Sequence, residues 1–230
     1  IRDRAKATGE AIVVPLDKRN GTAVLELSNA TNAAITVAAT YRNINGSVAS
    51  TTSYNLPAYS TIHVVADSIL STVLGSVSLD GSAASSVIAV GVHYSRDAAA
   101  ELQNAYALFG REAKGTQYRS SYNTFLGQSC DLILVNSTSS DVTSFVTMTR
   151  YDGSIVANAE MVTTPANGVT NYDLCSKDTA DRYGSVVVES SVADSITGAV
   201  VRHGAGESYQ FATELQRFDH LSICGISPFC

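Results

Sequence analysis

Tryptophan is absent from this chain, and lysine occurs at only four positions, Lys6, Lys18, Lys114 and Lys177. Charged residues make up 16% of the chain, whereas about 25% is usual in soluble domains, and the net charge is −6. Nucleic acids and anionic membranes both bind basic surfaces, so we expect neither as a partner. The absence of tryptophan, with aromatics at 7%, also argues against the aromatic platforms of glycosidases and carbohydrate-binding modules.

Long hydrophobic runs are also absent. Runs such as Ser86 to Val92 are far shorter than the roughly 20 residues of a membrane-spanning helix, so we expect no membrane span. The chain begins at Ile1 without a signal-peptide pattern, which we interpret as a mature or trimmed product. Serine and threonine supply 50 of the 230 residues. A surface rich in hydroxyl groups favours an extracellular or cell-surface location.

The first half of the chain contains no cysteine, and the second half contains Cys130, Cys175, Cys224 and Cys230. An even number predicts two disulfides and an oxidising compartment. Three pairings are open, and we favour Cys130–Cys175 with Cys224–Cys230. A metal site is the alternative, but there is no C-x-x-C pair and the histidines do not cluster with the cysteines. We therefore predict no metal and no other cofactor.

One stretch of the sequence occurs twice. Leu25 to Val48 and Leu132 to Ile155 are related by a shift of 107 residues, with eight identities in 24 positions and no gap. A turn dipeptide lies at the same place in both copies, Asn45-Gly46 in the first and Asp152-Gly153 in the second. Asn-Gly favours a type I′ hairpin turn, because that turn needs positive φ at both central residues.

Strand signals recur every 8–14 residues with turn residues between them, and no stretch shows a capped helical period. The best helical candidate, 97–108, aligns with strand-like residues of the second copy, so we predict a strand for its second half. Pro15 cannot donate a ladder hydrogen bond, which places the first strand, AIVVPL, at a sheet edge. The other strands that we predict are Ala23 to Leu27, Ile35 to Tyr41, Val48 to Leu56, Thr61 to Val65, Val73 to Leu79, Val87 to Tyr94, Leu102 to Leu108, Asp131 to Val135 and Phe145 to Tyr151.

Both halves share the pattern L-x-L-x-N-x-T, a β-branched strand, [ND]-G-S, a Pro-Ala turn and G-S-V. This pattern resembles tandem immunoglobulin-like modules of secreted bacterial surface proteins, and the resemblance implies an extracellular structural or adhesive role. We predict an all-β chain of two tandem immunoglobulin-like β-sandwich domains, related by an internal repeat of about 107 residues. The predicted parts are an arm with an edge strand at 1–16, module one at 17–109, a linker at 110–119, module two at 120–217 and a tail at 218–230.

Four N-x-S/T triplets begin at Asn20, Asn29, Asn45 and Asn136, and each is a candidate glycosylation site. Asn29 and Asn136 stand at equivalent positions just past a predicted strand. For these two, the alternative is a turn in which the asparagine side chain bonds to the local backbone.

A Ser-His-Asp site is the strongest catalytic candidate, formed by Ser95, His93 and Asp97. No G-x-S-x-G elbow accompanies these residues, and Arg202 stands at the place of His93 in the second copy. We therefore expect a surface or turn histidine and no enzyme. Calcium binding at Asp152-Gly153 or Asp178 to Asp181 is a weaker alternative, because the spacing of known calcium loops is missing.

The first strand suggests how the chain assembles. Such a strand can complete the sheet of a neighbouring subunit or pair within its own module. We predict a non-enzymatic extracellular structural protein, a self-associating subunit of a surface filament or layer with inter-subunit strand pairing. The alternative is a monomeric adhesive or ligand-binding β-sandwich module of a larger cell-surface protein, with a surface glycan or protein as its ligand. The residues that we predict for inter-subunit pairing are Ala11, Ile12, Val13, Val14, Pro15 and Leu16.

Overall fold

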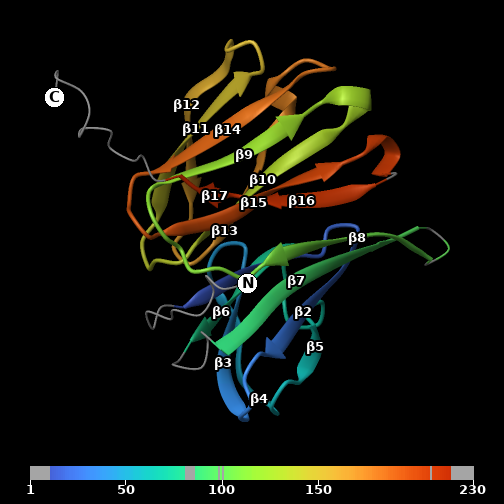
Figure 1. Cartoon of the computed structure of the whole chain (residues 1–230), viewed down its shortest axis with the longest axis vertical. Coiled ribbons are helices and arrows are strands. Elements are labelled where there is room, and N and C mark those ends of the chain that lie inside the picture. The colour runs from blue at the N-terminus through green and yellow to red at the C-terminus, as the bar shows by residue number, and fades with distance from the viewer. Residues whose placement is uncertain (1–10, 81–85, 98, 100, 208, 219–230) are drawn as a thin grey trace.

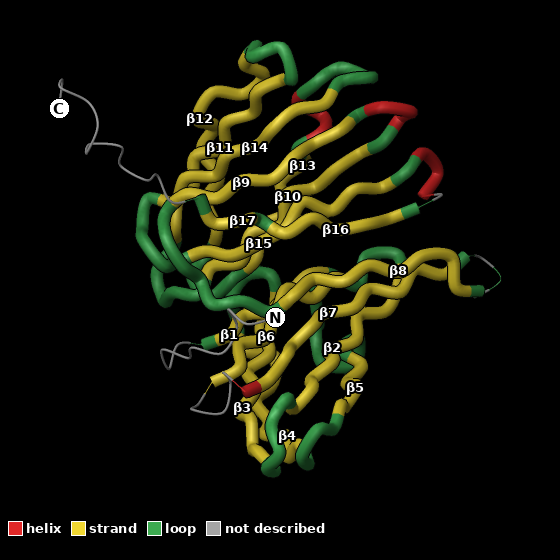
Figure 2. The backbone as a smooth tube through the Cα atoms, viewed as in Figure 1, coloured by secondary structure: helices red, strands yellow, loops and turns green. Residues whose placement is uncertain are grey.

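The computed structural model describes residues 11–80, 86–97, 99, 101–207 and 209–218. These residues form four antiparallel sheets, with short 3-10 turns between some strands (Figures 1 and 2). The prediction of an all-β fold is confirmed, and each strand predicted from the sequence is present, Val48 to Leu56 and Thr61 to Val65 with the predicted ends and the others with one or both ends shifted by one to three residues. No helix in the described part of the chain is long and apolar enough to span a membrane. Cys224, Cys230 and residues 1–10 of the predicted arm lie outside the described residues.

Two sheets form a first sandwich, with strand orders β1-β6-β3-β4 and β5-β2-β7-β8. Leu25 and Leu27 of β2 enter its core together with Tyr41 of β3, because alternate residues of a strand face the same side. β1 lies at a sheet edge, as Pro15 predicts. The strands are β1 (Ile12–Asp17), β2 (Gly21–Asn29), β3 (Ile35–Asn43), β4 (Val48–Leu56), β5 (Thr61–Val65), β6 (Leu74–Asp80), β7 (Val87–Arg96) and β8 (Leu102–Phe109).

The other two sheets form a second sandwich with its own core. Their orders are β12-β11-β14-β9-β17 and β13-β10-β15-β16, which repeat the first sandwich with each strand number raised by eight and β17 added. This order is compatible with the predicted duplication, which stays a prediction. The strands are β9 (Gln117–Asn123), β10 (Ser129–Asn136), β11 (Val142–Arg150), β12 (Ile155–Thr164), β13 (Val169–Asp173), β14 (Tyr183–Ser190), β15 (Ile196–His203), β16 (Gln210–Glu214) and β17 (Gln216–Arg217).

The hairpin turns differ from the type I′ prediction. Gly46 and Gly153 have φ of +83° and +84°, but the residues before them, Asn45 and Asp152, do not have positive φ. In the first turn the Gly46 N–H donates to the Asn43 carbonyl at 2.9 Å, and the Asn43 N–H donates to the Ser47 carbonyl at 2.9 Å. This pattern is a three-residue hairpin loop in which only the last residue needs positive φ, so glycine is required there and asparagine before it is not.

The sandwiches are stacked along the long axis of the molecule and share a third apolar cluster (Figure 1). Val13, Leu74 and Leu108 of the first sandwich pack there against residues of β10, β13 and β15. Consequently Leu132, Ile133, Leu134 and Val135 of β10 are all buried, because both faces of their sheet are covered. β2, at the same place in the first sandwich, instead alternates between buried and partly exposed residues.

Candidate functional site at the junction of the sandwiches

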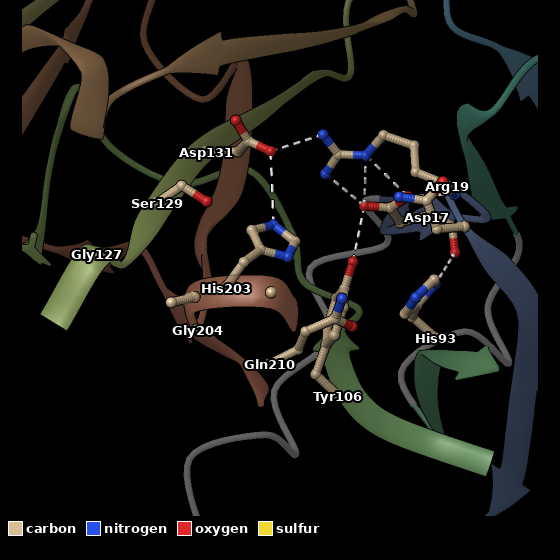
Figure 3. A pocket seen from close by; sticks show the side chains of 13 residues that line it. Asp17, Arg19, His93, Tyr106, Gly127, Ser129, Asp131, His203, Gly204 and Gln210 are labelled. Carbon is tan, nitrogen blue, oxygen red and sulfur yellow. Dashed lines mark hydrogen bonds and ion pairs between the residues drawn. The ribbon is translucent and has the colours of Figure 1, made fainter. Parts of the chain in front are cut away.

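A polar cavity of about 340 Å³ opens beside this apolar cluster, and both sandwiches line it (Figure 3). The first sandwich contributes the end of β1 and inward side chains of β7 and β8. The second contributes the starts of β10 and β16 and the loop after β15. The lining residues are Asp17, Arg19, Asn20, His93, Tyr106, Gly127, Ser129, Asp131, His203, Gly204, Ala205, Gly206 and Gln210.

The centre of the site is the pair formed by Asp17 and Arg19. β1 ends at Asp17, whose Oδ1 accepts the Arg19 backbone N–H at 2.9 Å, so the chain turns locally around the carboxylate. The Arg19 guanidinium donates to both oxygens of Asp17, with Nη2 to Oδ2 at 2.6 Å. Its Nη1 donates to Oδ2 of Asp131 in β10 at 2.7 Å. One arginine therefore joins a carboxylate of each sandwich across the junction.

Tyr106 and His93 hold Asp17 from the other side. The Tyr106 hydroxyl donates to Asp17 Oδ2 at 2.7 Å, and the His93 ring nitrogen Nδ1 lies 2.9 Å from the Asp17 backbone oxygen. The two rings pack with centroids 4.8 Å apart. Burial and the Asp17 carboxylate raise the pKa of Tyr106 far above its ordinary value, so this hydroxyl stays protonated and remains a donor.

Asp131 is shared between Arg19 and His203. Burial acts to raise the pKa of Asp131, but the hydrogen bonds and charges of His203 and Arg19 outweigh it and hold that pKa below its usual value. The ion pair acts in the same way on its partner: burial alone would lower the pKa of Arg19, whereas Asp17 and Asp131 raise it. Asp131 is thus ionised and the Arg19 guanidinium is charged at neutral pH.

Two polar atoms of the lining have no hydrogen-bond partner among the described residues. They are Nδ1 of His203 and Oε1 of Gln210, and Gln210 is only 8% exposed. His203 Nε2 faces Asp131 Oδ2 at 3.7 Å, so Nδ1 is the ring nitrogen that this carboxylate does not meet. The cavity therefore offers one acceptor, Gln210 Oε1, and one ring nitrogen, His203 Nδ1, to a polar ligand.

The Ser-His-Asp candidate is not assembled. Ser95 donates to the Asn104 carbonyl at 3.3 Å, and the Asp97 carboxylate accepts the N–H groups of Ala99 and Glu101. The expectation of a surface or turn histidine at His93 is wrong, because His93 is buried behind Tyr106. Sequence reasoning also missed Arg19 and Asp131, which lie 112 residues apart and meet only because the sandwiches dock.

The disulfide predicted between Cys130 and Cys175 is present and buried. It ties β10 to the 3-10 turn that follows β13 rather than to a second strand. The sequence signal that found it was the cysteine count together with the compartment argument. The second predicted pair, Cys224–Cys230, lies outside the described residues.

The asparagines of two sequons have structural roles. Asn29 Nδ2 donates to the carbonyls of Ala33, Leu56 and Pro57, and its Oδ1 accepts from Thr31. Asn136 makes the same five bonds in the second sandwich. The nitrogen that would bear a glycan is thus fully used and buried, which supports the turn alternative at both positions. Asn20 and Asn45 are exposed and remain candidate acceptors.

The predicted assembly strand pairs within its own chain. Residues 12–16 belong to β1, which is antiparallel to β6. On the other edge of β1, Val13 and Arg111 exchange both backbone hydrogen bonds, at 2.9 and 3.0 Å. One edge of the strand is therefore paired along its length with β6 and the other is paired at Val13, which argues against its exchange between subunits.

Comparison with known proteins gives little guidance. No family model matches the chain, and no curated protein matches it. A search of solved structures finds a Bacteroides uniformis beta-glucuronidase 2 at TM-score 0.20 and 8% identity, covering 92% of this chain and 27% of that one. A putative beta-galactosidase from Bacteroides fragilis follows at TM-score 0.19 and 12% identity, with 90% and 33% covered. The chain thus spans at most about a third of these structures, and scores this low support no argument about fold or activity. They give no support for the immunoglobulin-like resemblance.

Proposed function

We propose that this chain is a non-enzymatic structural subunit of an extracellular filament or layer that assembles from copies of itself. The observation on which the proposal depends is the contact between the two sandwiches. An end of the first sandwich is buried against the outer face of a sheet of the second, through one apolar cluster and the Arg19–Asp131 ion pair. Such a contact joins two different surfaces, so it is of the kind that can be repeated from unit to unit without closing.

Two further observations support the proposal. The Cys130–Cys175 disulfide fits an oxidising compartment. The side chains of the catalytic candidate are all engaged in structural hydrogen bonds, which is compatible with a non-enzymatic role. The β1 strand, in contrast, is paired within the chain, so we propose assembly through packed faces rather than through strand exchange.

The test is the size and shape of the purified, non-reduced full chain. Light scattering over a wide concentration range and negative-stain microscopy should show regular polymers whose mass grows with concentration. A monomer of 24.1 kDa at every concentration would overturn the proposal.

A second candidate function, a ligand-binding module, is favoured by the unpartnered polar atoms of the junction cavity. Because Gln210 Oε1 accepts and His203 Nδ1 donates or accepts according to its tautomer, the fitting ligand is small, uncharged and rich in hydroxyl groups. Titration of the full chain with monosaccharides and polyols, followed by NMR, tests this. Binding that is lost in Gln210→Leu but kept in the exposed control Met161→Ser would support it. The absence of any binding-dependent shift would exclude it.

A further inference from the structure

The second sandwich ends in a cluster of exposed aromatic rings, which we name the aromatic tip. It consists of Phe125, Tyr151 and Tyr183, which are 39%, 64% and 47% exposed. The rings of Tyr151 and Tyr183 are stacked with centroids 4.9 Å apart, and Phe125 lies 6.0 Å from Tyr183. Large aromatic side chains gathered on a surface mark interaction sites in soluble proteins. The β11–β12 turn that carries Tyr151 points away from the first sandwich (Figure 1).

Strand register identifies the same place in the first sandwich. Tyr183 pairs with the last residue of β9, as Leu74 pairs with the last residue of β1. Tyr151 follows β11 directly, as Ile44 follows β3. Phe125 donates its N–H to the side chain two residues before it, as Arg19 does. The counterparts of the aromatic tip are therefore Leu74, Ile44 and Arg19.

These counterparts are covered, whereas the aromatic tip is not. Leu74 is buried in the junction cluster, and the Ile44 carbonyl accepts the Val169 N–H of the second sandwich at 2.8 Å. The turn glycines show the same contrast. A Cβ added to Gly46 would collide with the Ala166 carbonyl oxygen, whereas a Cβ on Gly153 would meet nothing within 4 Å. The chain thus has one occupied and one vacant copy of the same docking end.

The surface that covers the first end also has a counterpart. It is the outer face of the sheet β13-β10-β15-β16, and the corresponding sheet of the first sandwich is β5-β2-β7-β8. On β7 the outward residues are Ile88, Val90, Val92 and Tyr94, and Val24 of β2 lies beside Val92. Ile88 and Val65 are 40% and 53% exposed. This face is open in the single chain; it is apolar along β7, and on β2 and β5 it also carries Glu26 and His63, whose side chains lie 3.5 Å apart.

The two open surfaces also match in polarity. Arg19 and Asp131 form the ion pair of the internal junction, and their counterparts are Phe125 and Val24, so a charged pair becomes an apolar pair. In the same way, Leu74 and Ile133 share the internal apolar cluster. Their counterparts are Tyr183 and Glu26, whose hydroxyl and carboxylate can form a hydrogen bond. In each case both residues of the pair differ in polarity between the internal junction and the proposed contact, as expected if the two residues touch each other in both contacts.

We infer that the aromatic tip docks on the outer face of the sheet β5-β2-β7-β8 of a second copy of this chain, in the way that the first sandwich docks on the second. This inference rests on the proposed self-assembly and names its surfaces. The contact is heterologous, so each added copy leaves one tip and one face free, and growth is open-ended.

The experiment introduces the arginine and the aspartate of the internal junction at the corresponding positions of the proposed contact. Phe125→Arg and Val24→Asp each place an unpaired charge against an apolar surface, and each should raise the concentration for half-assembly at least about tenfold. An aspartate already stands at the place of Val24 in β10, so the strand tolerates it. The double variant F125R/V24D recreates the Arg19–Asp131 pair between copies and should restore assembly. Met161→Ser, an exposed residue of β12, is the control.

Each outcome has a distinct meaning. If the wild type assembles and neither single variant impairs it, these surfaces are wrong while self-assembly stands. If only Phe125→Arg impairs assembly, the aromatic tip docks on another surface and the sheet face is wrong. If the wild type is monomeric at all concentrations, both the inference and the proposed function fail. Circular dichroism of each variant shows that the fold is kept before assembly is compared.

Discussion

In the first sandwich, the N–H of Ala23 donates to the Asp67 carboxylate at 2.9 Å. At the corresponding place in the second sandwich, Cys130 is bonded covalently to Cys175. A second pair of ties differs in charge: Asn43 accepts from Ser71 at 3.0 Å, whereas Arg150 donates to Asp178 at 2.6 Å. The two sandwiches thus have the same strand order, but the first is cross-linked by hydrogen bonds at places where the second has a disulfide and an ion pair. The cross-linking bonds can therefore change while the strand order stays the same.

The largest expected difference comes from the disulfide. Replacing Cys130 and Cys175 by alanine removes a cross-link over 45 residues, which should lower the free energy of unfolding by roughly 4 kcal/mol. Hydrogen exchange followed by mass spectrometry resolves the two halves, and peptides of β10 and β13 should lose most protection. The Asp67→Ala variant removes the corresponding tie of the first sandwich and should cost far less. Equal losses in the two variants would contradict the comparison.

The junction ion pair should give the next largest effect. Arg19→Met leaves the buried Asp17 carboxylate without its cation, and we expect a loss of about 3 kcal/mol in the free energy of unfolding, at the lower end for a broken buried pair. The loss is at the lower end because Arg19 is partly exposed, so water can solvate part of the Asp17 carboxylate once the guanidinium is gone. Chemical denaturation measures the change. The double variant D17N/R19M, which removes both charges, should recover part of the loss; no recovery would show that the pair is not the cause.

Substitutions of the two turn glycines separate the contribution of the junction to stability from the backbone strain that both substitutions cause. Gly46→Ala and Gly153→Ala both place alanine at positive φ, which costs about 1 kcal/mol each. Only Gly46→Ala also presses against the Ala166 carbonyl of the other sandwich, which should add about 2 kcal/mol of overpacking. The difference between the two thermal unfolding curves measures the junction alone. Identical curves would mean that the two sandwiches can shift apart to accommodate the added methyl group without a loss of stability.

The smallest expected effect is a loss of stability at acidic pH in the second sandwich. The hydrogen bond from Arg150 lowers the pKa of Asp178 to about 2, against the opposing effect of burial and with help from Tyr122. A lowered pKa in the folded state stabilises the fold above the ordinary value near 4, and this contribution is lost as the pH falls from about 4 to about 2. Hydrogen exchange should therefore show β14 loosening over this range, with the region of Asn43 unaffected. Asp178→Asn should abolish that pH dependence; an unchanged profile would contradict the assignment.

Local patterns in the sequence predicted the strands well. Alternation in β2, the asparagine-glycine turn and Pro15 all act within a few residues; the structure has the strand, the hairpin and the edge position that they predict, although the turn is not of type I′. β9 was missed because its polar sequence, QYRSSYN, lacks an apolar alternation, and its first three residues lie in the predicted linker. It is a strand because β14 supplies its ladder.

The candidate site could not be predicted because it depends on docking. Arg19 and Asp131 carry no spacing signal, and the chain brings them together only through the packed junction. One signal was present nevertheless: the run Leu132, Ile133, Leu134 and Val135 is apolar at every position, which indicates a strand covered on both faces. Because β2 alternates and the corresponding strand β10 does not, the comparison indicates that the sheet of β10 is the one against which the first sandwich packs.

The buried network of Asn29 has a consequence for producing this protein. In a host whose secretory pathway attaches glycans to unfolded chains, the triplet Asn29-Ala30-Thr31 is presented to the transferase before the network forms. A glycosylated Asn29 keeps a single N–H and cannot serve all three carbonyls, so modification and folding compete for one nitrogen. Such a host should yield two populations, one folded and bare at this position and one modified and retained. Thr31→Val ends the competition while leaving those donors in place, and it should raise the secreted yield there but not in a host without the transferase.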